Sequence, residues 1–461
     1  MADIRFTIDN VFSNRVGEHG ITATDLDHNA AKAAVAAFRQ RVDSGEIGFP
    51  ILPDDTRTAS AITQFANGLR KKIDDVLLVG IGGSALGAYA LDVALRGPHP
   101  VQTAIGANKL TKRAASPKPR LVTLDNVDPG FIAAALGGLD PRRTAVVVIA
   151  KSGSTAETLA TFMIVREWLH SALGKKARER IIAVTDPKKG DLLQIAQQEQ
   201  YPLFFVPPSV GGRFSVFTPV GLVPAALIGI DIGKVLRGAR DANKLCWSDN
   251  PAKNIALQSA LVHHALDTQR GKKIEVVFAY SQYLWGSAFW YRQLWAESLG
   301  KRVNRRDEVV HTGQTPIAAL GVTDQHSQLQ LYAEGPNDKM ITFWEVEKLR
   351  LDLTIPRDFK QFDSAKYLGG KKIGQLFRAE RVATEAALTQ AGRPNCRWTL
   401  PRVDEQTIGA FFQMLEFQTA FAGELYGIDA FDQPGVEQGK KMTYGLMGRK
   451  GYEEFAQGLK L

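Results

Sequence analysis

Short apolar runs alternate with helical periodicity along the first half of the chain. Val76–Val79 and Ala145–Ala150 have the length of buried strands, and each leads through a loop of small residues into a helical pattern. Ile181–Val184 is a third such run and ends in a turn at Thr185-Asp186-Pro187. Strands that alternate with helices predict a doubly wound, mostly parallel sheet, in which ligands bind beyond the carboxyl ends of the strands.

A second unit of the same form begins near residue 273. Ile274–Ala279 is its first strand and Trp285–Glu297 its first long helix. The Ala-rich start of the chain, the stretch before this unit and the end of the chain have helical patterns. The predicted organisation is a helical N-terminal segment (1–73), a first α/β domain (74–234), a helical connection (235–272), a second α/β domain (273–445) and a C-terminal tail (446–461). The two α/β domains have the form of an internal duplication.

Composition narrows the class of protein. The 461 residues are 44% hydrophobic and 23% charged, and no apolar run has the length of a membrane span. The first ten residues lack the pattern of a secretory signal, and the only two cysteines, Cys246 and Cys396, are far apart. We therefore expect a cytoplasmic protein without a disulfide framework or a cysteine-rich zinc site.

The net charge of +9 fits an anionic metabolite as well as nucleic acid. The densest basic run, Lys301–Arg306, has no interleaved aromatic residues, so we expect no nucleic-acid partner.

Two loops at predicted strand ends suit a phosphate group. Gly80-Ile81-Gly82-Gly83-Ser84 would let backbone N–H groups at a helix start approach an anion. A dinucleotide loop would need glycine at position 85, where the chain has Ala85. Lys151-Ser152-Gly153-Ser154-Thr155 has three hydroxyls in four residues at a strand-to-helix junction, whereas an ordinary helix cap needs one. This second loop predicts a phosphate cradle.

Two segments further along the chain contain charged residues that are candidates for catalysis. In Gly211-Gly212-Arg213, an arginine follows two glycines. This arrangement either exposes the guanidinium group to an anionic ligand or forms an ordinary surface turn with a solvated arginine. Gln293 and Glu297 lie four residues apart on one helix face. Aromatic and apolar residues surround them in sequence and would desolvate the carboxylate, which suits a general base: Trp285, Phe289, Trp290, Leu294 and Trp295.

A histidine and a lysine complete the candidates for proton handling. His326 lies in a polar loop, with His311 as its nearest rival, and Lys440 follows the Gln433-Pro434-Gly435 corner at a helix start. His263 and His264 are adjacent on a helix and so point apart, which makes them a poor metal pair. Since no other metal-binding pattern occurs, we expect a metal-free reaction without a cofactor.

Six segments in this order resemble glucose-6-phosphate isomerases, from about Val76 to Lys441. They are Gly82–Ser84, Lys151–Thr155, Gly211–Ser215, Gln293–Lys301, Thr323–Ser327 and Gln433–Lys440. The resemblance implies two sugar-isomerase-type α/β domains with helical additions, usually in a homodimer. It also implies interconversion of glucose 6-phosphate and fructose 6-phosphate through a cis-enediol, a reaction of glycolysis and gluconeogenesis.

The resemblance also implies roles for residues. Glu297 would move the proton between C1 and C2, Lys440 and His326 would assist ring opening, and Arg213 would stabilise the enediolate charge. His326 would reach the site of the neighbouring subunit, so that activity requires a dimer. The phosphate would bind Ser84, Ser152, Thr155 and the backbone around Lys151, and the sugar would lie against Gly83, Gln293 and Gln433.

Two positions depart from the family pattern, and two alternatives stay open. Ala150 replaces a serine that many members carry, which removes one phosphate contact, and Phe214 replaces a common tyrosine. The alternatives are an isomerase that also accepts mannose 6-phosphate and a non-catalytic phosphosugar-binding protein. The second would not need Glu297, His326 and Lys440 together.

Overall fold

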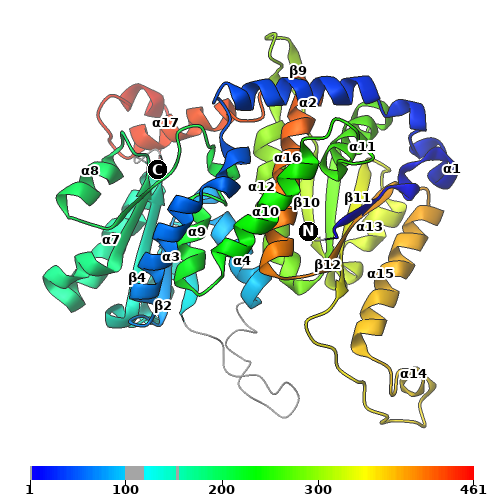
Figure 1. The fold of residues 1–461 in the computed structure, drawn as a ribbon, viewed down its shortest axis with the longest axis horizontal. Helices are drawn as coiled ribbons and strands as arrows, with labels where there is room; N and C mark the ends of the chain where they lie inside the picture. Colours follow the sequence, from blue (N-terminus) through cyan, green and yellow to red (C-terminus); the bar gives the residue numbers. More distant parts are fainter. Residues whose placement is uncertain (1–2, 99–118, 152–154, 461) are drawn as a thin grey trace.

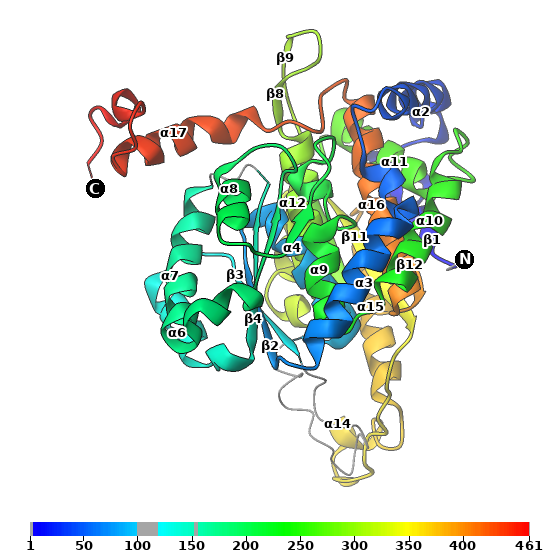
Figure 2. The same ribbon diagram turned by 60° about the vertical axis from the view of Figure 1, so that its left-hand side comes forward.

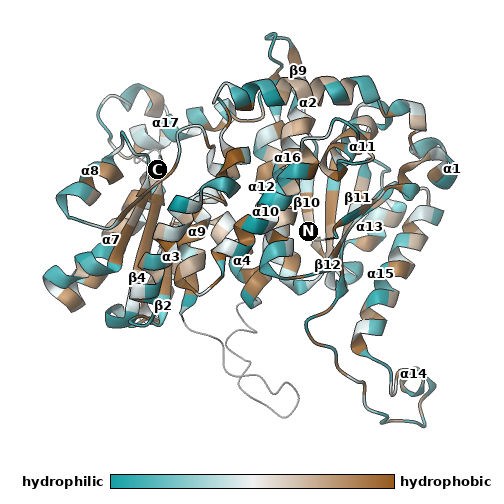
Figure 3. Cartoon of the chain, in the orientation of Figure 1, coloured by the Kyte–Doolittle hydropathy of each residue, from teal (hydrophilic) through white to brown (hydrophobic). Residues whose placement is uncertain are grey.

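The chain folds into two mostly parallel sheets that lie side by side with helices between them (Figure 1). The structure is a computed structural model and describes residues 3–98, 119–151 and 155–460. The predicted doubly wound α/β class is confirmed. Figure 3 shows the strands of the first sheet mostly in brown, since they consist mainly of buried apolar residues.

The first sheet has five parallel strands in the order β3-β2-β4-β5-β6. They are β2 (Asp75–Val79), β3 (Arg120–Leu124), β4 (Thr144–Ala150), β5 (Ile181–Thr185) and β6 (Leu203–Phe205). Since β3 and β4 lie on opposite sides of β2, the winding direction reverses between β2 and β4, where Val79 pairs with Val148. The two candidate phosphate loops follow these two strands, at the switch point where such sheets bind ligands.

The second sheet has the order β1-β12-β11-β7-β10. Its strands are β1 (Arg5–Thr7), β7 (Ile274–Tyr280), β10 (Thr315–Leu320), β11 (Lys339–Lys348) and β12 (Asn395–Arg402). When β7 is matched with β2, four parallel strands of each sheet have the same order, β3-β2-β4-β5 and β10-β7-β11-β12, which supports the expected internal duplication. The fifth strand differs, because β1 is antiparallel and comes from the start of the chain, whereas β6 is parallel. A separate hairpin, β8 (Lys301–Val303) and β9 (Val309–Thr312), projects from the body (Figure 1).

Helices cover and separate the sheets. Figures 1 and 2 place α4 (Leu86–Arg96), α10 (Ile232–Cys246), α12 (Trp285–Leu299) and α16 (Glu405–Leu425) between them, and α7 (Ala156–Leu173) and α8 (Asp191–Gln198) on the outer side of the first sheet. Residues Thr407–Gly423 of α16 are all buried, as expected for a helix that is apolar on most sides. Among the described residues, no helix is long and apolar enough to cross a membrane. The other α-helices of the described residues are α1 (Ser13–Val16), α2 (His28–Asp43), α3 (Thr56–Arg70), α6 (Pro129–Gly137), α9 (Pro219–Leu227), α11 (Ile255–Arg270), α13 (Leu329–Glu334), α14 (Asp363–Lys366), α15 (Ile373–Gln390) and α17 (Glu437–Leu446).

The helical prediction for residues 1–73 is wrong at the start of that segment. Strand β1 pairs antiparallel with β12, with Arg5 opposite Thr399, and the ring of Phe6 lies 4.9 Å from that of Trp398. Three residues are too few to show strand periodicity, and their partner lies almost 400 positions away in the chain. The N-terminus therefore extends the second sheet.

Candidate functional site

Arg213 lies at the centre of the candidate site. It belongs to the short helix η8 (Gly212–Phe214) and is only 3% exposed. Its guanidinium donates to Ser298 Oγ (2.7 Å), to Gln433 Oε1 (2.9 Å) and to the carbonyls of Ala430 (2.6 Å) and Asp432 (2.9 Å). Burial lowers the pKa of Arg213, and the neighbouring carboxylate of Glu297 opposes that shift.

Glu297 faces this guanidinium from the last turn of α12. Its Oε2 atom lies 3.4 Å from Arg213 Nη1, and its Oε1 atom accepts from Gln293 Nε2 at 3.4 Å. The side chain is 35% exposed. The expected contact of Glu297 and Gln293 on one helix face is therefore present, and it joins them to Arg213.

The aromatic surroundings expected for Glu297 differ from those observed. Trp290 stacks on Phe412 in the core, and Trp295 stacks on Tyr291; both tryptophans are almost fully buried. The aromatic rings thus pack the buried face of α12, whereas the hydrogen-bond partners of the carboxylate are a guanidinium and an amide. The Glu297 carboxylate therefore lies beside charged and polar groups and not in the expected apolar pocket.

The glycine loop after β2 packs against both of these segments. A Cβ at Gly82, which has a φ of +55°, would lie 2.8 Å from Gln293 Nε2. A Cβ at Gly83 would lie 2.4 Å from the carbonyl of Gly212. Gly83 and Ser84 form the short helix η5 (Gly82–Ser84) with Gly82. The close approach of η5 and η8 therefore requires glycine at position 83.

Replacing Gly83 with alanine is expected to push η5 away from η8 and to raise the KM of the expected phosphosugar substrate by about 10-fold or more, since an ångström of misplacement at a binding loop has large effects. Steady-state kinetics on the purified variant measures the change. Gly137→Ala is the matched control, because a Cβ at the end of α6 meets nothing within 4 Å. Equal KM values for the two variants would contradict the steric role of Gly83.

The ammonium group of Lys151 donates hydrogen bonds to main-chain carbonyls of the protein. Its Nζ donates to the carbonyls of Pro208 (2.9 Å) and Val210 (2.7 Å), just before the Gly211-Gly212-Arg213 segment. Burial lowers the pKa of Lys151, with an opposing effect from Asp186. Thr155 lies at the N-cap position of α7, and Ser152 lies outside the described residues. The side chain of Lys151 thus holds the arginine loop, which leaves its backbone for the predicted phosphate contact.

Two predicted residues lie apart from this cluster. Lys440 on α17 is 46% exposed and pairs with Glu437 at 2.8 Å. His326 ends the short helix η10 (Thr323–His326) after β10 and is exposed. Among the described residues, neither side chain contacts Glu297 or Arg213. In one chain, the structure therefore brings Gly83, Arg213, Gln293, Glu297 and Gln433 together but not His326 or Lys440.

His263 and His311 have environments that differ from that of His326. His263 is fully buried and its Nε2 lies 2.8 Å from Glu275 Oε1, so it belongs to the core. His311 lies in the exposed strand β9 of the projecting hairpin. In the described ranges, no group of three or more His, Cys, Asp or Glu side chains is arranged to hold a metal ion. Metal independence stays a prediction.

The two departures from the family pattern are both buried. Phe214 is 1% exposed, and its ring lies 5.0 Å from that of Phe49 and 4.9 Å from that of Phe431. Ala150 ends β4 and is 2% exposed. The ring of Phe214 therefore packs beside Arg213 without a hydroxyl.

Sequence reasoning missed two residues that hold the site together. Ser298 accepts from Arg213 Nε, and Lys301 donates to the carbonyls of Glu297 (2.6 Å), Ser298 (3.0 Å) and Asp432 (3.1 Å). Their signal in the sequence is that both belong to the Gln293–Lys301 segment, in which Ser298 directly follows Glu297 and Lys301 is the last residue. Ser298 binds Arg213, and Lys301 binds the carbonyl of Asp432, and no local pattern predicts where these distant partners lie.

The comparisons with known proteins agree with this arrangement. The family model described as phosphoglucose isomerase matches residues 60–450. A glucose-6-phosphate isomerase of Carboxydothermus hydrogenoformans is 43% identical over 98% of this chain and 97% of its own length. Among solved structures, a hypothetical protein of Thermus thermophilus has a TM-score of 0.83 at 36% identity, covering 96% of this chain and 100% of that one. A glucose-6-phosphate isomerase of Chlamydia trachomatis has a TM-score of 0.72 at 25% identity, covering 85% of this chain and 73% of that one.

Proposed function

This chain belongs to the phosphoglucose isomerase family, and we propose that it interconverts glucose 6-phosphate and fructose 6-phosphate. The observation that carries the proposal is the contact of the Glu297 carboxylate with Arg213 Nη1, at 3.4 Å, where Gln433 also meets Arg213. This arrangement combines a proton acceptor with a fixed positive charge, which suits a reaction through an anionic intermediate.

In the proposed mechanism, Glu297 acts on the open-chain sugar. Its carboxylate takes the proton from C2 of the aldose, the C1 carbonyl becomes a hydroxyl or alkoxide, and a cis-enediol or enediolate forms. The same carboxylic acid then returns the proton to C1, while the C2 hydroxyl gives up its proton, which is transferred to the C1 oxygen, so that the C2 ketone and the C1 hydroxyl form and the carboxylate is restored. Arg213 stabilises the negative charge that develops on the oxygens, and Lys440 and His326 assist opening of the ring.

The phosphate group would bind at the switch point of the first sheet. Ser84, Ser152 and Thr155 with the backbone around Lys151 would hold it, near the start of α7, where helix N–H groups favour an anion. Gly83, Gln293 and Gln433 would line the sugar. The packing of Gly82 and Gly83 on Gln293 and η8 supports this placement, because it joins the loop after β2 to the catalytic residues.

The proposed active form is a homodimer whose site takes His326 from the second subunit. The exposed position of His326 in one chain supports this proposal. Apolar side chains are also exposed beyond β11 and on α15. They are Leu351 (54%), Leu353 (41%), Ile373 (43%) and Val382 (48%). Exposed apolar patches often mark protein contacts. We also propose a cytoplasmic location, which the unpaired, buried Cys246 and Cys396 support.

A shared site predicts complementation between two inactive variants. His326→Ala and Glu297→Gln homodimers should each be nearly inactive, whereas their heterodimer contains one site with both residues intact. Random assortment after co-expression should therefore restore about one quarter of the wild-type activity. Activity of the purified mixture measures this. If the mixture stays as inactive as its parents although heterodimers form, each site takes both residues from one subunit.

The reaction itself is tested by conversion of fructose 6-phosphate to glucose 6-phosphate in excess EDTA. We expect turnover that EDTA does not change, and parallel rates on mannose 6-phosphate would define the substrate range. Absence of turnover with and without added divalent metal, together with tight phosphosugar binding, would favour the non-catalytic alternative.

A further inference from the structure

We propose that Lys301 is a positioning residue for the isomerase reaction, because its ammonium fastens residues 428–433 to the end of the helix that carries Glu297. We call residues 428–433 the strap; it connects α16 to the short helix η11 (Pro434–Val436) and α17. The strap contains Gln433 and leads to Lys440. The proposal rests on the proposed function, since it assumes that these residues meet the substrate.

All three N–H donors of Lys301 have acceptors. They are the carbonyls of Glu297, Ser298 and Asp432, and the side chain is only 6% exposed. The carbonyls of Glu297 and Ser298 belong to the last turn of α12, where helix carbonyls lack intrahelical partners. One ammonium therefore closes the end of α12 and connects it directly to the strap.

Arg213 and Lys301 meet on a single atom of the strap. The carbonyl of Asp432 accepts from Arg213 Nη2 at 2.9 Å and from Lys301 Nζ at 3.1 Å. Asp432 directly precedes Gln433, whose Oε1 is held by Arg213. The position of the Gln433 side chain relative to Glu297 thus depends on both cations.

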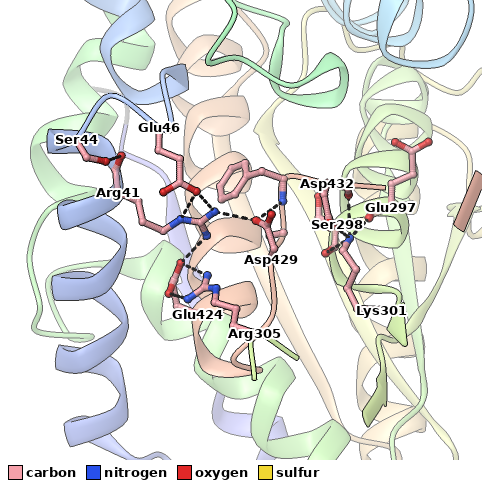
Figure 4. A network of polar contacts seen from close by, with 12 residues as sticks. Arg41, Ser44, Glu46, Glu297, Ser298, Lys301, Arg305, Glu424, Asp429 and Asp432 are labelled. Atoms are coloured by element: carbon pink, nitrogen blue, oxygen red, sulfur yellow. Dashed lines mark hydrogen bonds and ion pairs between the residues drawn. The ribbon is translucent and has the colours of Figure 1, made fainter. Parts of the chain in front are cut away.

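A third cation holds the strap from its other side. Arg41 of α2 pairs with Asp429 at 2.8 Å, and its guanidinium carbon lies 5.1 Å from the ring centre of Phe431. Figure 4 shows Arg41 and Lys301 on opposite sides of the strap, with Asp429 and Asp432 between them. Arg41 contacts Asp429 and Phe431, whereas Lys301 and Arg213 are, within the described part of the chain, the cations that tie the strap to the end of α12.

The charge of Lys301 is unfavourable for folding on its own. Burial lowers the pKa of Lys301, and the positive charge of Arg213 lowers it further, with Asp432 acting in the opposite direction. An apolar side chain of similar length would fill the same space without this desolvation. Unlike an apolar side chain, the lysine forms hydrogen bonds in fixed directions, and these hold the Asp432 carbonyl against the end of α12.

The test compares Lys301→Met with Lys339→Met. Lys339 is the matched control, because it is equally buried at 7% exposure and donates to the Pro336 carbonyl beside Asp338, in the second sheet and without any contact to the strap. We expect Lys301→Met to lower kcat/KM by about 10- to 100-fold. We also expect it to speed hydrogen exchange at residues 428–433. Lys339→Met should change neither quantity, and thermal melting of both variants shows whether they are folded.

A double-mutant cycle with Gln433→Ala separates positioning from a general loss of structure. If Lys301 acts through the strap, Lys301→Met should cost much less in the Gln433→Ala background than in the wild type. Additive losses, equal losses in the Lys301 and Lys339 variants, or a wild-type kcat/KM for Lys301→Met would overturn the proposal.

A second variant, Lys301→Arg, tests the proposal if Lys301→Met folds poorly. Lys301→Arg keeps a cation with a bulkier head, so it should fold, exchange faster at the strap and retain more kcat/KM than the methionine variant. Wild-type exchange and kcat/KM in Lys301→Arg, with Lys301→Met unfolded, would show a purely structural role. If the wild-type enzyme lacks isomerase activity, the proposed function fails, whereas the exchange data still report whether Lys301 holds the strap.

Discussion

Glu297→Gln is expected to lower kcat by about 1000-fold, which is typical for loss of a general base at carbon. The amide is isosteric with the carboxylate and still accepts a hydrogen bond from Arg213 Nη1, so the site should keep its geometry. It cannot take a proton from C2. Steady-state kinetics in both directions measures the loss, and binding of fructose 6-phosphate to the variant should stay near the wild-type level.

Glu308→Gln is the control for this substitution. Glu308 lies in the turn of the projecting hairpin, is 55% exposed, and pairs with Arg306. Its replacement removes one surface carboxylate and should leave kcat unchanged. A Glu297→Gln enzyme with wild-type turnover would show that another group moves the proton, and the role of Glu297 would have to be abandoned.

The strands that the sequence predicts well are those buried on both faces. β2, β4, β5 and β7 appear as apolar runs because parallel strands between helix layers have no polar face. β12 contains Asn395, Arg397 and Arg402 among its apolar residues, and its pairing with β1 joins opposite ends of the chain. Such pairings follow from the packed fold, so neither strand could be predicted from a local pattern.

In the candidate site, too, a contact within one helix could be predicted from the sequence, whereas contacts between distant segments could not. The spacing of Gln293 and Glu297 predicts their contact, because residues four apart on a helix share a face. The contact of Arg213 with Gln433 joins residues 220 positions apart. The family resemblance placed both residues at the substrate but did not predict their contact. The roles of Ser298 and Lys301 depend on where the strap lies. The positions of His326 and Lys440 relative to the substrate are not determined by contacts within one chain, so their roles stay predictions.

Arg213→Lys is expected to impair both stability and catalysis, although it preserves the charge. Lysine offers one compact ammonium where the guanidinium fork reaches Ser298, Gln433 and the two strap carbonyls at once. A lysine at this position leaves several buried acceptors without a donor, which should lower the free energy of unfolding by about 2–4 kcal/mol. Because the fixed charge near Glu297 also shifts, kcat/KM should fall by about 100-fold or more.

Chemical denaturation and steady-state kinetics on the same preparations measure the two effects of Arg213→Lys. Arg96→Lys is the matched control, since Arg96 is also buried, at 6% exposure, and donates to the carbonyls of Pro119 and Ile228 near the end of α4. The control should lose stability by a similar amount and keep its kcat/KM. If Arg213→Lys loses stability alone, the arginine only holds the strap, and the enediolate charge must be stabilised by other groups.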